Sequence, residues 1–171
     1  AGEEKRAKYI YIALFHRFIA EYAIWKPDLE IAKKELEKSN EIYMSEPTRD
    51  RYFVKYKYKI MLLDVLSGDA DKAIQVSDEL LKEVTADYDK TQVLFHKAFA
   101  YYCKDLHDEA LALCNEALNI ATLLKMPLVE AELETLKSIC KKESIKDYKN
   151  NEINNWCKHI GKVILETKEK Y

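Results

Sequence analysis

Glycine and proline are scarce in this sequence, since its 171 residues contain only three of each. Average proteins carry about 12% of these two residue types together. β-Sandwiches, β-barrels and doubly wound sheets need turn residues at short intervals. Phosphate-binding loops of the common kind need several glycines close together. The shortage therefore excludes β-rich folds and glycine-rich nucleotide-binding loops.

Long apolar runs and an excess of one charge are also missing. No stretch of about 18 consecutive apolar residues exists, so we expect no transmembrane helix and no membrane partner. The 28 basic and 30 acidic residues give a net charge of -2, which predicts no broad attraction to nucleic acid or to anionic membranes. The chain starts with charged residues instead of an apolar signal segment, and we therefore expect a cytoplasmic protein.

The sequence shows no recognisable reaction centre. Its four cysteines form no C-x-x-C pair and lack clustered ligand partners, which a zinc site would need. They are therefore predicted to be reduced core residues: Cys103, Cys114, Cys140 and Cys157. No serine or cysteine nucleophile accompanies the histidines in a known motif. We expect no enzyme activity, no metal and no cofactor; an enzyme of the phosphatase-accessory kind is the least favoured alternative.

Helical periodicity runs through almost the whole chain, which predicts about eight helices joined by short turns. Tyrosine and lysine alternate over residues 52–59 with the period of a strand. That stretch continues without turn residues into an apolar run and has no partner strand, so we predict a helix there. At the clearest turn, Gly68 is expected to close one helix in the left-handed conformation, and Asp69 or Asp71 to cap the next.

Turn-plus-helix phrases recur along the chain. Ala73 and Ala110 occupy matching places 37 residues apart, and Ala32 lies 41 residues before Ala73. A helical unit that recurs at such intervals is typical of a solenoid. In a solenoid each hairpin buries its faces against its neighbours, because it cannot bury them alone.

The third unit carries small and aromatic residues at specific places. Ala98 is followed by Tyr101 in the first helix, and Ala110 by Ala117 in the second. Small side chains let two helices cross closely, and the aromatic ring fills the space beside them. In these positions the unit resembles a tetratricopeptide repeat. The second unit keeps only Ala73 of this pattern.

The resemblance implies an all-α fold, a right-handed superhelical stack of about four helical hairpins. It implies a single domain over residues 1–171, with hairpins at 5–44, 48–85, 90–124 and 127–171, the last being a capping pair. Tetratricopeptide solenoids bind partners on a concave face lined by the first helix of each pair. The corresponding register in this sequence gives the candidate partner-binding residues: Arg17, Lys55, Tyr58, Leu62, Gln92, Phe95, Phe99 and Tyr102.

These residues form an apolar, aromatic set with few polar members, which suits an extended or helical peptide. Each of them could instead pack in the core. Phe95 and Phe99 occupy positions where some family members hold a carboxylate with polar side chains, so no such clamp is expected. The lysines of residues 49–59 spread around their helix, and we do not expect nucleic acid to bind through this chain.

The sequence therefore predicts noncatalytic recognition of a peptide or protein. Two alternatives stay open. The chain is similar to the peptide-binding domains of Gram-positive quorum-sensing regulators, which implies a peptide-sensing domain of a transcription regulator without its DNA-binding part. Alternatively, the chain is a scaffold or oligomerisation module that forms a homodimer through its aromatic faces.

Overall fold

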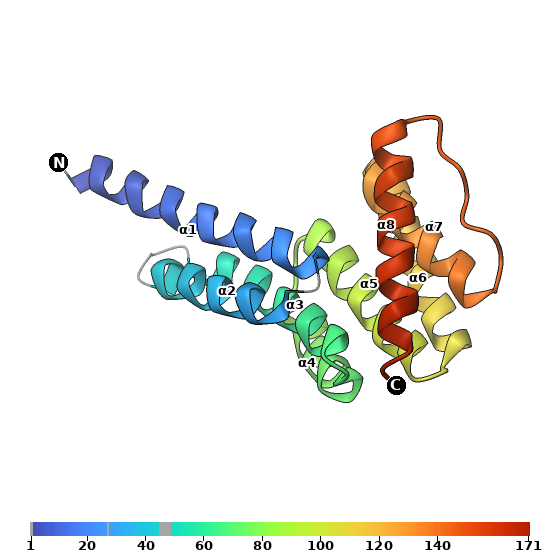
Figure 1. Ribbon diagram of the computed structural model, residues 1–171. Helices are drawn as coiled ribbons and strands as arrows, with labels where there is room; N and C mark the ends of the chain where they lie inside the picture. Colours follow the sequence, from blue (N-terminus) through green and yellow to red (C-terminus); the bar gives the residue numbers. More distant parts are fainter. Residues whose placement is uncertain (1, 27, 45–48) are drawn as a thin grey trace.

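The computed structural model describes residues 2–26, 28–44 and 49–171 (Figure 1). These residues form helices and no strand, as the periodicity predicted. The helices are α1 (Gly2–Trp25), α2 (Leu29–Met44), α3 (Arg49–Leu66), α4 (Ala70–Glu83), α5 (Asp87–Cys103), α6 (His107–Leu123), α7 (Pro127–Cys140) and α8 (Asn151–Lys168). The predicted helix over residues 52–59 is confirmed as part of α3. The breaks predicted at Pro27 and at residues 45–48 lie outside the described residues.

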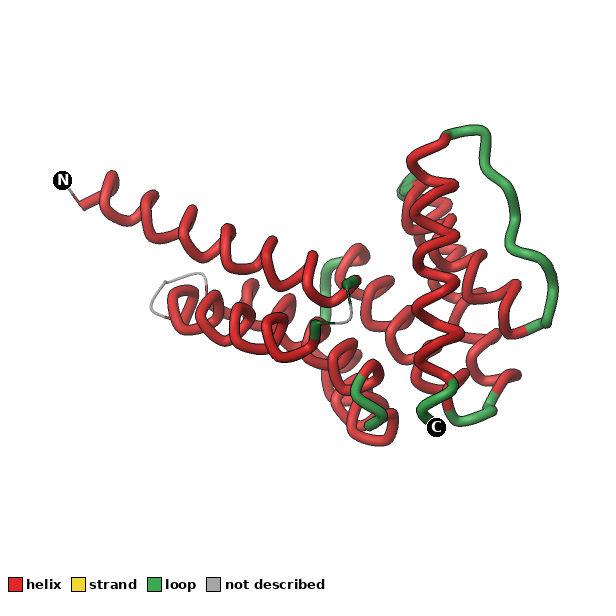
Figure 2. The backbone as a smooth tube through the Cα atoms, viewed as in Figure 1, coloured by secondary structure: helices red, strands yellow, loops and turns green. Residues whose placement is uncertain are grey.

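The helices pack mainly as neighbours along the chain. Each helix contacts the next one along the chain. In addition, α3 contacts α5, and α5 contacts α7. Short turns join most of the described helices, whereas an extended segment leads from α7 to α8 (Figure 2). This pattern of contacts is compatible with a helical solenoid.

The core contains the small residues that the repeat pattern marked. Ala73, Ala98, Ala110 and Ala117 are fully buried, and Tyr101 packs against the core while partly exposed. The four cysteines are buried and unpaired, which confirms their predicted place in the core. Burial raises the pKa of the Cys103 thiol to about 12, so this thiol stays protonated at neutral pH.

Four helix ends share one turn geometry. After α3, the backbone N–H of Gly68 bonds to the carbonyl of Val65 and that of Asp69 to Asp64, which is the Schellman arrangement. The same pair of bonds ends α5, α6 and α7, where the left-handed residues are Asp105, Lys125 and Lys142. Gly68 closes α3 with φ of 96°, and Asp69 caps α4 by accepting from Lys72 N, as predicted. Non-glycine residues at three of these turns help to explain why the chain needs so few glycines.

Helix α8 and the residues that follow it reach the ends of three earlier helices. The last residues of an α-helix have carbonyls without a partner in the helix. His159 Nε2 lies 2.7 Å from Trp25 O, Lys168 Nζ donates to Cys103 O at 2.7 Å, and Lys170 Nζ donates to Leu66 O at 2.8 Å. These oxygens belong to the last residues of α1, α5 and α3. The C-terminal segment therefore holds α8 across three helix ends.

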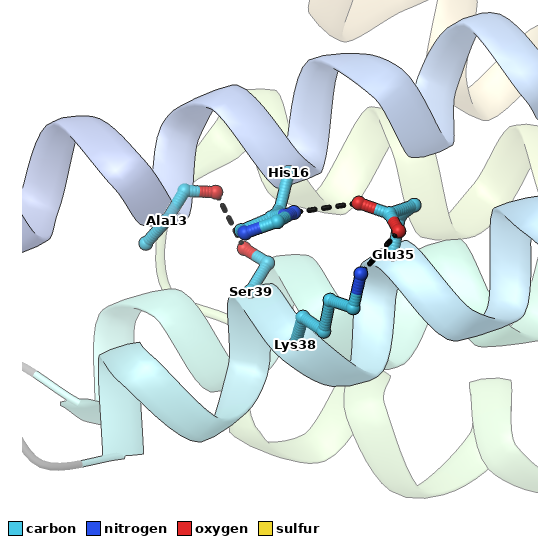
Figure 3. A network of polar contacts seen from close by, with 5 residues as sticks. All are labelled: Ala13, His16, Glu35, Lys38 and Ser39. Carbon is cyan, nitrogen blue, oxygen red and sulfur yellow. Dashed lines mark hydrogen bonds and ion pairs between the residues drawn. The ribbon is translucent and has the colours of Figure 1, made fainter.

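A partly buried polar network joins α1 to α2 (Figure 3). His16 Nδ1 donates to Glu35 Oε2 at 2.5 Å, and Lys38 Nζ donates to Glu35 Oε1 at 2.7 Å. Ser39 Oγ donates to the carbonyl oxygen of Ala13 at 2.9 Å. The hydrogen bonds from Lys38 and His16 lower the pKa of the Glu35 carboxyl. The network gives the first helix pair a specific register.

No helix in the described part of the chain is both long and apolar enough to cross a membrane.

Candidate ligand-binding cavity

A cavity of about 500 Å³ lies where the first, third, fifth, seventh and eighth helices come together. Its wall is formed by the C-terminal end of α1, the middle of α3 and the first halves of α5, α7 and α8. The lining residues are Glu21, Tyr22, Trp25, Lys26, Lys59, Tyr88, Gln92, Phe95, His96, Leu128, Val129, Glu132, Trp156 and His159. Aromatic rings therefore form much of the wall, with a few charged and polar groups among them.

The two tryptophans of the chain meet at this cavity. Their ring centroids lie 5.2 Å apart with the planes at 74°, an edge-to-face contact that suits the charge distribution of aromatic rings. Trp25 is the last residue of α1, and Trp156 lies one turn before His159 on α8. Because His159 bonds to the carbonyl of Trp25, the same two helices fix both the backbone and the rings of this wall.

Glu132 is one of two carboxylates in the cavity wall and is partly exposed. Its Oε1 accepts a hydrogen bond of 2.7 Å from Trp156 Nε1. Burial raises the pKa of Glu132, while the Trp156 hydrogen bond and the charge of Lys59 oppose that shift. No lysine, arginine or histidine among the described residues forms an ion pair with Glu132. This carboxylate therefore has one hydrogen-bond donor and no cation partner in salt-bridge contact.

The other polar groups of the wall have different surroundings. Lys59 Nζ lies 3.3 Å from Glu21 Oε1, so these two charges pair with each other. His96 is buried, and burial lowers the pKa of its imidazole to about 3, which keeps the ring neutral. Its Nδ1 is buried and has no hydrogen-bond partner in the described structure.

The structure separates the predicted partner-binding residues into three groups. Gln92 and Phe95 line the cavity. Leu62 and Phe99 are fully buried, and Tyr58 and Tyr102 nearly so, and all four contribute to the core. For this group the structure shows the core packing that the sequence left open as an alternative.

Arg17 and Lys55 lie outside the cavity. Arg17 Nε is 3.7 Å from Glu21 Oε1, and Lys55 Nζ is 3.8 Å from Asp89 Oδ1. Lys55 and Asp89 also border a separate hollow of about 790 Å³ between α3 and the turn before α5. That hollow contains no tryptophan, and these two charges face each other across 3.8 Å. The charged residues are therefore engaged with acidic neighbours instead of pointing into the aromatic cavity.

Sequence reasoning missed most of the cavity wall. Tyr88 and Glu132 were not singled out, and Trp156 was assigned to a capping pair. The one available signal was that both tryptophans of the chain lie at or near helix ends. The sequence does not show that α8 folds back to bring Trp156 against Trp25.

Among the described residues, no three side chains of histidine, cysteine, aspartate or glutamate gather where they could hold a metal ion. The chain matches no protein-family model, no curated protein and no solved structure.

A second notable surface lies on α1. Tyr11, Phe15, Phe18 and Tyr22 are 71%, 63%, 58% and 68% exposed, respectively. Their spacing of four, three and four residues places them along one side of the helix. We call these four residues the α1 aromatic stripe. A contiguous exposed apolar patch of this kind marks an interaction surface more often than a chance exposure.

Proposed function

We propose that this chain is a noncatalytic recognition domain that binds a segment of a peptide or protein in the aromatic cavity. The observation that carries the proposal is the composition of the cavity wall. Aromatic and aliphatic side chains from five helices surround a small number of polar groups, which is the usual composition of a ligand-binding site. Its volume of about 500 Å³ suits a few side chains and the backbone between them.

We also propose that the helices form a right-handed superhelical stack of tetratricopeptide type. The support is the contact of α3 with α5 and of α5 with α7, because every second helix would line the same face in such a stack. The repeated turn geometry after α3, α5 and α7 is a second support. In this arrangement the cavity lies on the face formed by the first helices, and α8 covers part of that face.

The proposal is tested by selecting peptides from a random twelve-residue phage-displayed library on the purified chain. Two leucines provide a matched pair of variants, since Leu128 lines the cavity and Leu124 does not, while both are about equally exposed. We expect selected peptides to bind the wild type and Leu124→Arg with similar affinity. Leu128→Arg should weaken binding by at least tenfold, because its guanidinium and longer chain enter the cavity.

Circular dichroism and thermal unfolding establish that both variants are folded. A library that yields no binder, or binders unaffected by Leu128→Arg, would contradict recognition at this cavity.

The α1 aromatic stripe favours a second candidate function, self-association into a homodimer. Alternating steps of three and four residues are the spacing by which two helices pack along a seam. A stripe that pairs with its own copy around a twofold axis needs no other partner. An aromatic side chain can bury about 150–250 Å² of surface. Since the four rings are each more than half exposed, the stripe offers on the order of 400–600 Å² of surface per copy for burial in a dimer. That approaches the roughly 800 Å² per partner of a standard interface.

Sedimentation equilibrium over a range of concentrations tests this second candidate. We expect the wild type to dimerise as concentration rises and Phe15→Glu to remain monomeric. Ile31→Glu, which changes an exposed apolar residue on α2, is the matched control and should dimerise like the wild type. A wild type that stays monomeric at all concentrations would rule out the homodimer.

A further inference from the structure

We propose that the ligand of the aromatic cavity carries a cationic group, an ammonium or a guanidinium, that pairs with the carboxylate of Glu132. A lysine or arginine side chain or the amino terminus of a peptide would supply such a group. This inference rests on the proposed function, since it names the chemistry of the segment that the cavity receives.

The first argument is the balance of hydrogen-bond donors and acceptors in the wall. The N–H groups that could meet an anionic ligand are already engaged. Trp156 Nε1 donates to Glu132, His159 Nε2 donates to the carbonyl of Trp25, and Lys59 pairs with Glu21. The exceptions are Lys26, which is exposed and lies over the ring of Tyr22 at 5.6 Å, and the side-chain amide of Gln92, which can both donate and accept.

The acceptors, by contrast, are not saturated. One oxygen of Glu132 takes the hydrogen bond from Trp156, and no described residue supplies a partner for the other. His96 also borders the cavity, but its unpartnered Nδ1 is fully buried and does not face the ligand. A ligand that donates hydrogen bonds therefore complements this wall better than one that accepts them.

The second argument is the uncompensated charge. A carboxylate removed from water is stabilised when a cation pairs with it, and Glu132 has no such partner at salt-bridge distance among the described residues. The aromatic wall adds to this preference, because a cation is attracted to the face of a tryptophan or tyrosine ring. Trp25, Trp156 and Tyr88 supply such rings around the cavity. An anionic ligand would instead meet the charge of Glu132, whereas Glu21 is already paired with Lys59.

The test uses the same random twelve-residue library. Glu132→Gln is the variant, and Glu134→Gln is its matched control. Both glutamates lie on α7, but Glu134 does not line the cavity. We expect the peptides selected on the wild type to share a lysine, an arginine or a required free amino terminus. Glu132→Gln should weaken their binding at least tenfold, and Glu134→Gln should leave it unchanged. The amide introduced by Glu132→Gln keeps an oxygen for Trp156 Nε1, so the wall retains its shape.

Binding of a selected synthetic peptide is measured by intrinsic fluorescence, because the only two tryptophans of the chain both line the cavity. Affinity should fall as the pH is lowered and Glu132 becomes protonated, and this fall should be absent in Glu132→Gln. Other titratable groups share the cavity wall, and the Glu132→Gln variant controls for them because it retains them all. They are Glu21, Lys26, Lys59, Tyr88, His96 and His159.

The outcomes separate this inference from the proposed function. Selected peptides without a basic group, or basic peptides that bind Glu132→Gln as well as the wild type, overturn the cationic ligand while recognition at the cavity stands. A library that yields no binder sensitive to Leu128→Arg overturns both.

Discussion

The ammonium of Lys168 donates a hydrogen bond of 2.7 Å to the carbonyl oxygen of Cys103, the last residue of α5. No backbone N–H of a described residue bonds to that oxygen, because it lies beyond the reach of the intrahelical pattern. Lys168 also pairs with Asp105 at 2.8 Å, on the turn that follows α5. A cation at a helix C-terminus is favourable for the helix dipole as well. Lys168 thus fixes α8 to α5 through the main chain and through charge.

Replacing Lys168 by methionine should destabilise the protein by about 1 kcal/mol. A hydrogen bond to a charged group contributes about 1.5–3 kcal/mol, and we lower this figure because the lysine remains partly exposed to solvent. Urea unfolding measures the change. Lys158→Met is the control, because Lys158 and its partner Asp147 are largely exposed and their pair should contribute less than about 0.5 kcal/mol. Equal losses in both variants would contradict a special role for Lys168.

Two adjacent lysines after α7 should respond in opposite ways to glycine. Lys142 has φ of 59° and Lys141 has φ of -84°. The left-handed conformation costs a non-glycine residue roughly 1–2 kcal/mol. A glycine, in turn, lowers the free energy of unfolding by about 0.4–1 kcal/mol, because it gives the unfolded chain more conformational freedom. Lys142→Gly should therefore stabilise the protein by about 0.5–1 kcal/mol, and Lys141→Gly should destabilise it by a similar amount. Thermal unfolding of both variants decides this, and a stabilising Lys141→Gly would refute it.

Gly68→Ala provides the converse test at the turn after α3. A Cβ atom at this position would meet no neighbour within 4 Å, so only the backbone conformation opposes the change. With φ of 96°, we expect a loss of about 1 kcal/mol in chemical denaturation. A neutral result would mean that the turn relaxes to another conformation.

Glu132→Gln should make the protein more stable at neutral pH, by on the order of 1 kcal/mol. Burial raises the pKa of Glu132 in the folded state, so the folded protein binds this proton more tightly than the unfolded chain. The carboxylate therefore opposes folding above its folded pKa, and that cost disappears as the pH falls toward its unfolded pKa. The stability difference between the variant and the wild type should shrink in acid. A variant less stable than the wild type at neutral pH would contradict this.

Glu35→Gln should have the opposite effect. Hydrogen bonds from Lys38 and His16 lower the pKa of Glu35 below its ordinary value of 4.5, so the charged form stabilises the fold. We expect the variant to lose about 1–2 kcal/mol at neutral pH. The difference should be complete above about pH 4.5 and should diminish as the pH falls through the lower folded pKa. Exposed Glu37→Gln is the control and should change stability by less than about 0.5 kcal/mol.

The helices and many of their ends could be predicted from the sequence because their causes are local. Three features depend only on nearby residues or on a period along the chain. They are the 3.6-residue periodicity, the turn at Gly68 and Asp69, and the recurring small residues Ala73 and Ala110. The burial of the cysteines was expected because they form no C-x-x-C pair and lack clustered ligand partners, so they behave as small apolar residues. These features gave an all-α chain of packed hairpins.

The place of individual aromatic residues could be predicted less well. A helical register assigns residues to a face, but it does not show how closely the next helix covers that face. Phe95 and Phe99 were both expected on the concave face, yet both are buried in the core, and only Phe95 borders the cavity. The difference comes from neighbouring helices whose approach depends on all the side chains between them.

The sequence by itself determined that this chain has few turns, and that those turns separate amphipathic helices recurring at a solenoid-like interval. Only the tertiary structure decided that α8 returns across the ends of α1, α3 and α5 and brings Trp156 against Trp25 and Glu132. The physical reason is that α8 is held by backbone carbonyls that α-helices leave unpaired at their C-termini. Every helix end offers such carbonyls, so residue identities do not show which of them a distant lysine or histidine will reach.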